Sequence, residues 1–419
     1  MSLPIQGWII INRRLIIMAK PQLRADQGWI FDNFLMLSDN EDVLHPGIMG
    51  ARLERGYKMQ DLEAVYSKVS GRRSFPKAWA KRAEVLEKMA ISAEKNKRHV
   101  TARQLYHRAA ICYGRAQHMV PIHGNEHKIR WFAGLYRCFD KVIEFSEGSM
   151  QKKSVEFLPN QTTHCILHKA PGEGPKPTVL FLPGMDQVKE DVPNPYNNDY
   201  TIRGMNICSM DGPGQGECNA NGVWQTEDNY PKAASAVLDW LVSQPEVDES
   251  RIGLLGLSMG SRWGVQVAAN DTRIKAVCGQ MANVGSFEMI FEHAQPNFKR
   301  IFMYMAGYEI ESEFDDFIKR MEYLPDIAKR LKVPHLLVAG DMDELCPPED
   351  IKTFRENLSG PTELWLYEGV FHPMGEVAGE IYPGIADWLY TSLIEGRPID
   401  YNRSVYVEDG TTISDYNHG

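Results

Sequence analysis

The chain has 419 residues, 43% of them hydrophobic and 24% charged, a composition typical of a globular protein. Its formal net charge of −9 argues against a nucleic-acid-binding protein, which normally presents a basic face. The basic stretch at 95–103 lies among residues with helical spacing and is interpreted as a solvated helix face.

The N-terminus carries two short apolar runs, at 8–11 and 15–18, which three polar residues separate. This interruption argues against a signal peptide, and no run reaches the roughly 20 apolar residues that span a bilayer. The seven cysteines show no metal or redox spacing and favour free thiols in a reducing compartment. We therefore expect a cytoplasmic protein without a membrane partner. The cysteines are Cys112, Cys138, Cys165, Cys208, Cys218, Cys278 and Cys346.

The first third of the chain has a helical pattern, and no strand is expected there. Ser74-Phe75-Pro76 is a typical helix start, and apolar residues then recur at helical spacing as far as Ala93. Further helices are expected at 102–118 and 127–145. We predict a helical cap domain over residues 1–148.

Residues 149–400 alternate short strands with helices, which predicts the α/β class with a mostly parallel sheet covered on both faces. The expected strands are 155–158 and 164–168, as a starting hairpin, and then 179–182, 205–210, 252–257, 274–279, 336–340 and 364–367. Helices are expected at 233–241, 260–269 and 385–394. The polar tail at 401–419 is expected to be irregular.

One connection, between the strands ending near Met281 and starting near Pro334, is about 50 residues long. Structureless loops of this length are rare in compact domains, so a helical insertion at 282–332 is expected. Its many Phe, Met and Tyr residues fit a packed insertion with its own core, and they also fit a lid over a substrate pocket. The two interpretations are compatible.

The strongest motif is Gly256-Leu-Ser258-Met-Gly260, which follows an apolar strand and precedes a helical segment. This strand–turn–helix context is that of the nucleophile elbow of the α/β-hydrolase fold, with Ser258 as the nucleophile. The alternative is a surface serine in a glycine-rich turn.

A serine needs a base, and in this fold the acid and then the histidine follow the serine along the chain. His372 comes after the last expected core strand and is the predicted general base. Asp341 and Asp343 compete for the acid position. The spacing Gly340-x-x-Asp343-x-x-x-Pro347 favours Asp343, and the alternative for either aspartate is a loop carboxylate that caps the next helix.

The oxyanion that forms during attack needs preorganised N–H donors. In this fold one donor is the residue after the nucleophile, here Met259, and the other lies in a loop after an earlier strand. Met185, in the loop at 183–186, is the predicted second donor. The segment Asp211-Gly-Pro-Gly-Gln-Gly-Glu217 lacks dinucleotide-binding spacing and is interpreted as a structural turn beside the site.

These segments together resemble the family of 2,6-dihydroxypseudooxynicotine hydrolase, which includes fungal hydrolases that shorten polyketide naphthopyrones. The resemblance covers most of the chain, and the positions that match the family triad are Ser258, Asp343 and His372. It implies cleavage of a C–C bond beside a ketone, or of an ester. It also implies an acidic substrate-site residue after the strand at 274–279, for which Glu288 and Glu292 are the candidates.

The sequence thus predicts an α/β-fold serine hydrolase that acts through an acyl-enzyme on an apolar, aromatic or polyketide-like small molecule. No metal or organic cofactor is expected, and a homodimer is a further expectation. The N-terminal helices and the insertion are expected to meet over Ser258 and enclose the substrate. An acyltransferase with the same acyl-enzyme and a catalytically silent binding relative are the alternative functions.

Overall fold

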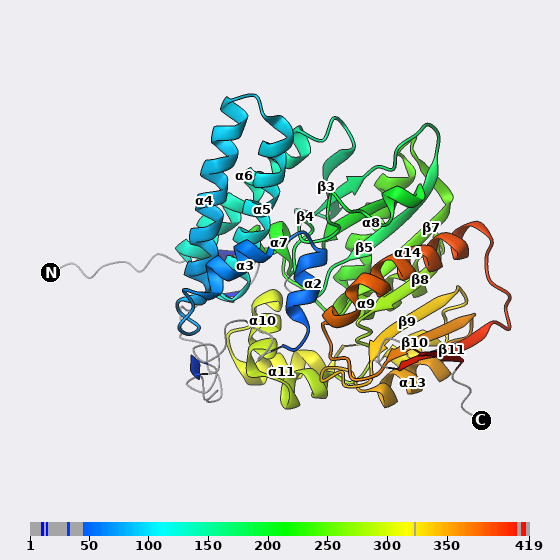
Figure 1. Ribbon diagram of the computed structural model, residues 1–419. Coiled ribbons are helices and arrows are strands. Elements are labelled where there is room, and N and C mark those ends of the chain that lie inside the picture. The colour runs from blue at the N-terminus through cyan, green and yellow to red at the C-terminus, as the bar shows by residue number, and fades with distance from the viewer. Residues whose placement is uncertain are drawn as a thin grey trace.

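The computed structural model describes residues 10–11, 14–15, 32–33, 45–185, 187–321, 324–408 and 412–415. It has three parts, which are a helical N-terminal part, a large sheet with flanking helices, and a helical segment inserted late in the sheet (Figure 1).

The sheet has ten strands in the order β12-β11-β10-β9-β8-β7-β5-β6-β4-β3. Neighbours from β11 to β6 are parallel, and β3, β4 and β12 pair antiparallel. The mostly parallel sheet that the alternating pattern predicts is therefore confirmed. The strands are β3 (Met150–Leu158), β4 (Gln161–His168), β5 (Lys176–Leu182), β6 (Asn206–Asp211), β7 (Val247–Leu257), β8 (Ile274–Gln280), β9 (His335–Gly340), β10 (Thr362–Tyr367), β11 (Asn402–Glu408) and β12 (Thr412–Asp415).

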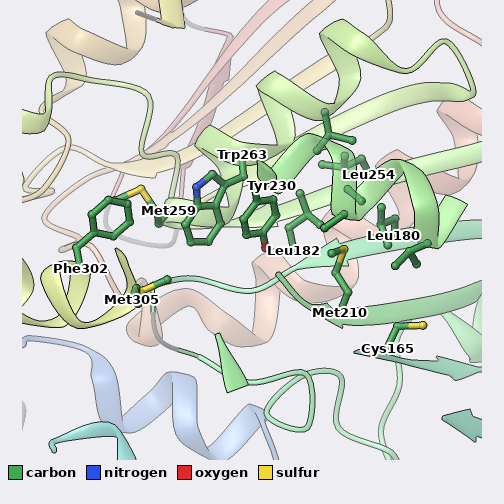
Figure 2. Packing of buried hydrophobic residues seen from close by; sticks show 14 of the residues in the cluster. Cys165, Leu180, Leu182, Met210, Tyr230, Leu254, Met259, Trp263, Phe302 and Met305 are labelled. Atoms are coloured by element: carbon green, nitrogen blue, oxygen red, sulfur yellow. The ribbon is translucent and has the colours of Figure 1, made fainter. Parts of the chain in front are cut away.

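Helices cover both faces of this sheet because successive residues of a strand point to opposite faces. On β7, Leu254 packs in one cluster with α8 (Asn229–Val242) and α9 (Met259–Asn270). The next residue, Leu255, packs in another cluster with α14 (Ala378–Ile394). Figure 2 shows the first cluster, in which the Trp263 ring of α9 stacks on the Tyr230 ring of α8 with centroids 4.2 Å apart. The central strands are thus buried on both sides. Shorter helical segments of this part are η1 (Thr201–Arg203), α7 (Gly216–Ala220), α13 (Pro348–Glu356) and η3 (Gly375–Val377).

The N-terminal part contains the helices α2 to α6, and it has its own apolar core. They are α2 (Ile48–Glu54), α3 (Met59–Tyr66), α4 (Phe75–Lys95), α5 (His99–His118) and α6 (Glu126–Glu144). Trp79 and Leu86 lie at the centre of this core, which extends to Ile166 of β4 and Val188. The helical part therefore packs directly on the sheet part.

The insertion after β8 is helical, and its aromatic residues pack against one another. It contains the π-helical turn η2 (Met289–His293), α10 (Pro296–Ala306), α11 (Glu311–Lys319) and α12 (Leu324–Ala328). Phe302 of α10 lies 5.4 Å from Phe291 and 5.9 Å from Phe314 between ring centroids. The same cluster includes Met259 of α9, which Figure 2 shows close to Phe302, so the insertion is anchored beside the nucleophile turn.

Two expectations about the chain ends are wrong. The tail is not irregular, because β11 pairs with β10 and continues the parallel sheet. Val405 is buried, but the other residues of β11 are partly or fully exposed, so this strand lacks the apolar run by which the core strands were predicted. Near the N-terminus, β1 (Ile10–Ile11) and β2 (Arg14–Leu15) pair antiparallel where no strand was expected. The rest of the two N-terminal apolar runs lies outside the described residues.

All seven cysteines lie in the described ranges, where every one is buried and free of a disulfide. Across those same ranges, no helix combines the length and apolar character that crossing a membrane requires.

Candidate active site

The turn after β7 holds Ser258 in a conformation that few residues other than glycine adopt. Ser258 has φ 53° and ψ −120°, directly between the last strand residue and the first residue of α9. A Cβ atom on Gly260 would lie 2.1 Å from the carbonyl oxygen of Leu182, so only glycine fits there. The Ser258 amide donates a hydrogen bond to the Gln280 carbonyl, at 2.8 Å. The strained elbow is therefore held by both neighbouring strands.

A continuous hydrogen-bond chain links Ser258 to His372 and Asp343. The distance from Ser258 Oγ to His372 Nε2 is 2.7 Å, and that from His372 Nδ1 to Asp343 Oδ2 is 2.8 Å. The amides of Leu345 and Cys346 donate to Asp343 Oδ1, at 2.8 and 2.9 Å. His372 and Asp343 are both buried. This geometry orients the imidazole with Nε2 toward the serine.

Asp341, the competing aspartate, points to different partners. Its Oδ1 accepts from the Gly369 amide at 2.7 Å, and its Oδ2 accepts from the Tyr406 hydroxyl at 3.0 Å. It therefore ties the turn after β9 to the loop after β10 and to β11. The structure brings Asp343, and not Asp341, to the histidine.

Two carboxylates determine the proton affinity of His372. Burial by itself lowers the pKa of this histidine, but Asp343 and the nearby charge of Glu344 outweigh it and raise the pKa above its usual value. Glu344 also accepts a hydrogen bond from the His372 amide, at 3.0 Å.

A second histidine, His45, lies against the same carboxylate and was not identified from the sequence. Its Nδ1 is 3.0 Å from Glu344 Oε1, and its ring lies nearly parallel to that of His372, with centroids 6.1 Å apart. Burial alone would raise the pKa of Glu344, but the hydrogen bond with His45 and the charge of His372 lower it to about 2. Glu344 thus joins the N-terminal part to the histidine loop. Nothing in the local sequence around His45 marks it, because its partner lies 299 residues away along the chain.

The two predicted oxyanion donors, Met185 and Met259, line one pocket together with Ser258 and His372. Met259 is the first residue of α9, so its amide belongs to the unpaired N–H groups at a helix start. On the other side, Gln215 Nε2 donates to the Gly184 carbonyl at 2.8 Å, next to Met185.

The Asp211–Glu217 segment supports this loop, as its interpretation as a structural turn implies. Gln215 Oε1 accepts from the Tyr230 hydroxyl and from the Gly212 amide, both at 2.9 Å. Its side chain is therefore oriented on one side by α8 and on the other by its own turn, and it fixes the backbone that leads to Met185.

A fully buried lysine ties the same loop to β6. Lys189 Nζ lies 2.8 Å from both Asp211 Oδ2 and Glu190 Oε1, and 3.4 Å from Glu217 Oε2. Burial lowers the pKa of Lys189, but the three carboxylates outweigh this and raise it well above its usual value. The Lys189 amide also donates to Asp211, at 2.8 Å. The residues after the predicted oxyanion loop are thus held by a buried ion cluster.

The pocket at Ser258 is formed by all three parts of the chain. The insertion contributes apolar side chains, such as Phe298 and Ile301 of α10. The N-terminal part contributes α2, Tyr57, Phe75 and the C-terminal end of α5. Helix α2 reaches the site because it packs closely on the loop after His372, where a Cβ on Gly50 would lie 2.1 Å from the Gly375 carbonyl oxygen.

Neither of the two acidic candidates in the insertion is among the residues that line this pocket. Glu288 is exposed and lies 3.5 Å from His293. Glu292 pairs at 2.7 Å with Lys299, a buried lysine that also contacts Glu311. The π-helical turn that carries Glu292 directs its neighbour Ile290 to the pocket instead. No group of three or more metal-ligating side chains occurs in the part of the chain that the structure describes.

Comparison with known proteins gives one family and several relatives. The family described as "Esterase FrsA-like" matches residues 48–306. A 2,6-dihydropseudooxynicotine hydrolase from Paenarthrobacter nicotinovorans is 26% identical over 231 residues, which cover 54% of this chain and 61% of that protein. The alpha/beta hydrolase xenA from Xenoacremonium sinensis is 27% identical over 255 residues, which cover 58% of this chain and 59% of that protein. An esterase FrsA from Salmonella paratyphi B is 26% identical over 142 residues, or 34% of each chain. The chain thus matches less than two thirds of the length of these relatives.

Two solved structures share the fold. The crystal structure of the 2,6-dihydroxy-pseudo-oxynicotine hydrolase superposes with a TM-score of 0.73 at 22% identity, covering 83% of this chain and 97% of that chain. AbyA5 superposes with a TM-score of 0.62 at 14% identity, and the match covers 81% of this chain and 94% of AbyA5. The expected α/β-hydrolase fold, with its additional helices, is therefore confirmed.

Proposed function

The chain belongs to the FrsA-like esterase family and is a hydrolase of the α/β fold, and from this premise we propose that it acts through an acyl-enzyme on Ser258. The observation that carries the proposal is the hydrogen-bond chain from Ser258 through His372 to Asp343. A serine hydroxyl becomes a nucleophile when a base at hydrogen-bond distance takes its proton.

In the proposed reaction, Ser258 Oγ attacks a substrate carbonyl while His372 Nε2 takes the hydroxyl proton. Asp343 keeps the Nδ1–H tautomer and stabilises the imidazolium that forms. The amides of Met185 and Met259 donate to the oxyanion, a role that their position beside Ser258 in the pocket supports.

His372 then returns the proton to the leaving group, and water hydrolyses the acyl-enzyme. An ester oxygen accepts this proton directly. A carbon leaving group is expelled only when a neighbouring carbonyl or phenol accepts its charge, so the same machinery serves an ester or a C–C bond beside a ketone. The names of the relatives support hydrolysis and do not distinguish the two bonds.

We expect Ser258→Ala to lose turnover while the protein stays folded. In a serine hydrolase, removal of the nucleophile lowers kcat by about 10⁶-fold. The measurement is labelling by a serine-directed phosphonate probe, with mass spectrometry of the labelled peptide, together with hydrolysis of p-nitrophenyl esters. Ser250→Ala, at an exposed position of β7, is the matched control, and it should still be labelled. Labelling that persists in Ser258→Ala would exclude Ser258 as the nucleophile.

A further inference from the structure

The three parts of the chain contribute different side chains to the pocket. The insertion and the sheet part line it with apolar side chains, such as Ile290 and Phe298, and with the amides of Gln295 and Asn283. The wall made by the N-terminal part carries three guanidinium groups, from Arg52 and Arg55 at the end of α2 and from Arg115 of α5. Their charges all act on Asp191, the carboxylate that lines the pocket beside them.

Arg55 is the residue that points to a ligand. It is buried, with 8% of its surface exposed, and its Nε donates to no acceptor among the described residues. Burial of a charged donor without a hydrogen bond costs folding free energy. Such a group in a pocket therefore points to a ligand that supplies the acceptor. Asp191 does not supply that acceptor, because its Oδ1 also lacks a hydrogen bond within the described part of the chain.

The backbone around Arg55 is fixed, which makes the site preorganised. The Arg55 amide donates to the Ala51 carbonyl at 3.3 Å, and Asn194 Nδ2 donates to the Glu54 carbonyl at 3.2 Å. The next residue but one, Tyr57, donates its hydroxyl to the Ile111 carbonyl at 2.9 Å. The side chain therefore projects from a segment that is held by both the cap and the sheet part.

Aromatic rings orient the two neighbouring guanidinium groups. Arg52 lies 5.7 Å from the Tyr57 ring centroid and 5.6 Å from that of Trp79, and Arg115 lies 5.2 Å from that of Phe75. Such contacts help to hold a guanidinium in place. Three guanidinium groups and the carboxylate of Asp191 thus line this side of the pocket.

We infer that Arg55, with Arg52 and Arg115 beside it, forms a subsite for a carboxylate at the end of the substrate remote from the reacting carbonyl. The inference rests on the proposed function, because the subsite belongs to the pocket of Ser258. A guanidinium matches a carboxylate through two parallel hydrogen bonds. The pocket therefore selects an apolar body that carries one negative charge at its cap end.

Binding tests the subsite without requiring turnover. In Ser258→Ala protein, isothermal titration with 2-naphthoate and with the neutral 2-naphthamide compares a carboxylate with an isosteric amide. We expect naphthoate to bind at least about tenfold more tightly, as a charge-assisted pair implies. Adding Arg55→Gln should abolish this preference, and Arg55→Lys should retain part of it. The surface variant Arg130→Gln, also in the N-terminal part, is the control that should keep the full preference.

Kinetics test the subsite in the active protein. The ratio of kcat/KM for p-nitrophenyl hydrogen glutarate to that for its methyl ester should be well above one, and it should fall about tenfold or more in Arg55→Gln. Equal binding of naphthoate and naphthamide would overturn the subsite, and so would an unchanged ratio in Arg55→Gln. If neither ester is hydrolysed and no phosphonate labels Ser258, the proposed hydrolysis fails. The naphthoate preference would still support the subsite in that case.

Discussion

Two aspartates that are two residues apart have different partners, and this difference predicts which one the reaction needs. Asp343 bonds His372, whereas Asp341 bonds Gly369 and Tyr406. Asp343→Asn should lower kcat by about 10⁴-fold, because an amide at this position favours the wrong imidazole tautomer. Asp341→Asn is the matched control and should lower kcat far less. Steady-state kinetics on one p-nitrophenyl ester compares them, and the reverse order would assign the acid to Asp341.

Glu344 predicts a shift in the pH dependence. Burial lowers the pKa of His372, and Asp343 and Glu344 raise it to a net value above the usual one. The base must be neutral, so kcat/KM should rise as the pH increases through this pKa. Glu344→Gln removes one negative charge, which lowers the pKa of His372 and should move the acidic limb of the profile to lower pH.

The measurement is kcat/KM against pH for the wild type and Glu344→Gln. Glu368→Gln, at an exposed position in the loop that leads to His372, removes a similar charge away from the imidazole and should leave the limb in place. A limb that stays at the wild-type pH, or moves to higher pH, in Glu344→Gln would contradict the electrostatic role of Glu344.

At the scale of elements, the loop after β5 depends on a buried ion cluster on β6. Lys189 is inaccessible to solvent and contacts Asp211 and Glu190, both of which are also buried. Lys189→Met leaves these carboxylates without their cation, and removal of one partner of a buried pair costs about 3–5 kcal/mol of unfolding free energy.

Denaturant-induced unfolding, followed by tryptophan fluorescence, measures this loss. The control is Lys153→Met, on an exposed position of β3, which should change the unfolding free energy little. A comparable stability for Lys189→Met and Lys153→Met would mean that the carboxylates find other partners or take up protons at little cost.

At the scale of the whole molecule, the N-terminal helices have their own core, and this core also supports the pocket. Trp79 is fully buried on α4, and its ring centroid lies 5.6 Å from that of Tyr57 and 6.3 Å from that of Phe75. Both of these neighbours line the pocket. Trp79→Ala should therefore cost about 3–5 kcal/mol of unfolding free energy and also raise KM for substrates that reach the cap wall.

Met89→Ala is the matched control, because Met89 lies on the same helix but is about half exposed. Urea unfolding and KM for p-nitrophenyl hydrogen glutarate are measured for both variants. If Trp79→Ala loses stability as expected but keeps the wild-type KM, the core of the N-terminal helices does not support the pocket.

The strands and the chemical motifs were predictable because local sequence encodes them. Each expected core strand lies within an observed strand or within one residue of it, since apolar runs between turns have one clear period. Ser258, Asp343 and His372 each follow a strand of a parallel sheet, and the carboxyl ends of such strands meet at one edge. Their order along the chain was therefore enough to predict that the three side chains meet.

Tertiary packing decided which other side chains surround Ser258 and His372 in the pocket. Arg55 and His45 reach the pocket from segments about 200 residues before Ser258. No local periodicity or motif predicts contacts between residues that are so far apart along the chain. For the same reason, the sequence could not predict the contacts of Glu292, which depend on a π-helical turn and on a buried lysine from the next helix. The sequence alone thus determined the fold and the proposed catalytic side chains, because both follow from local periodicity and chain order. Only the tertiary structure decided the charge of the pocket wall, since that depends on how two distant parts of the chain pack together.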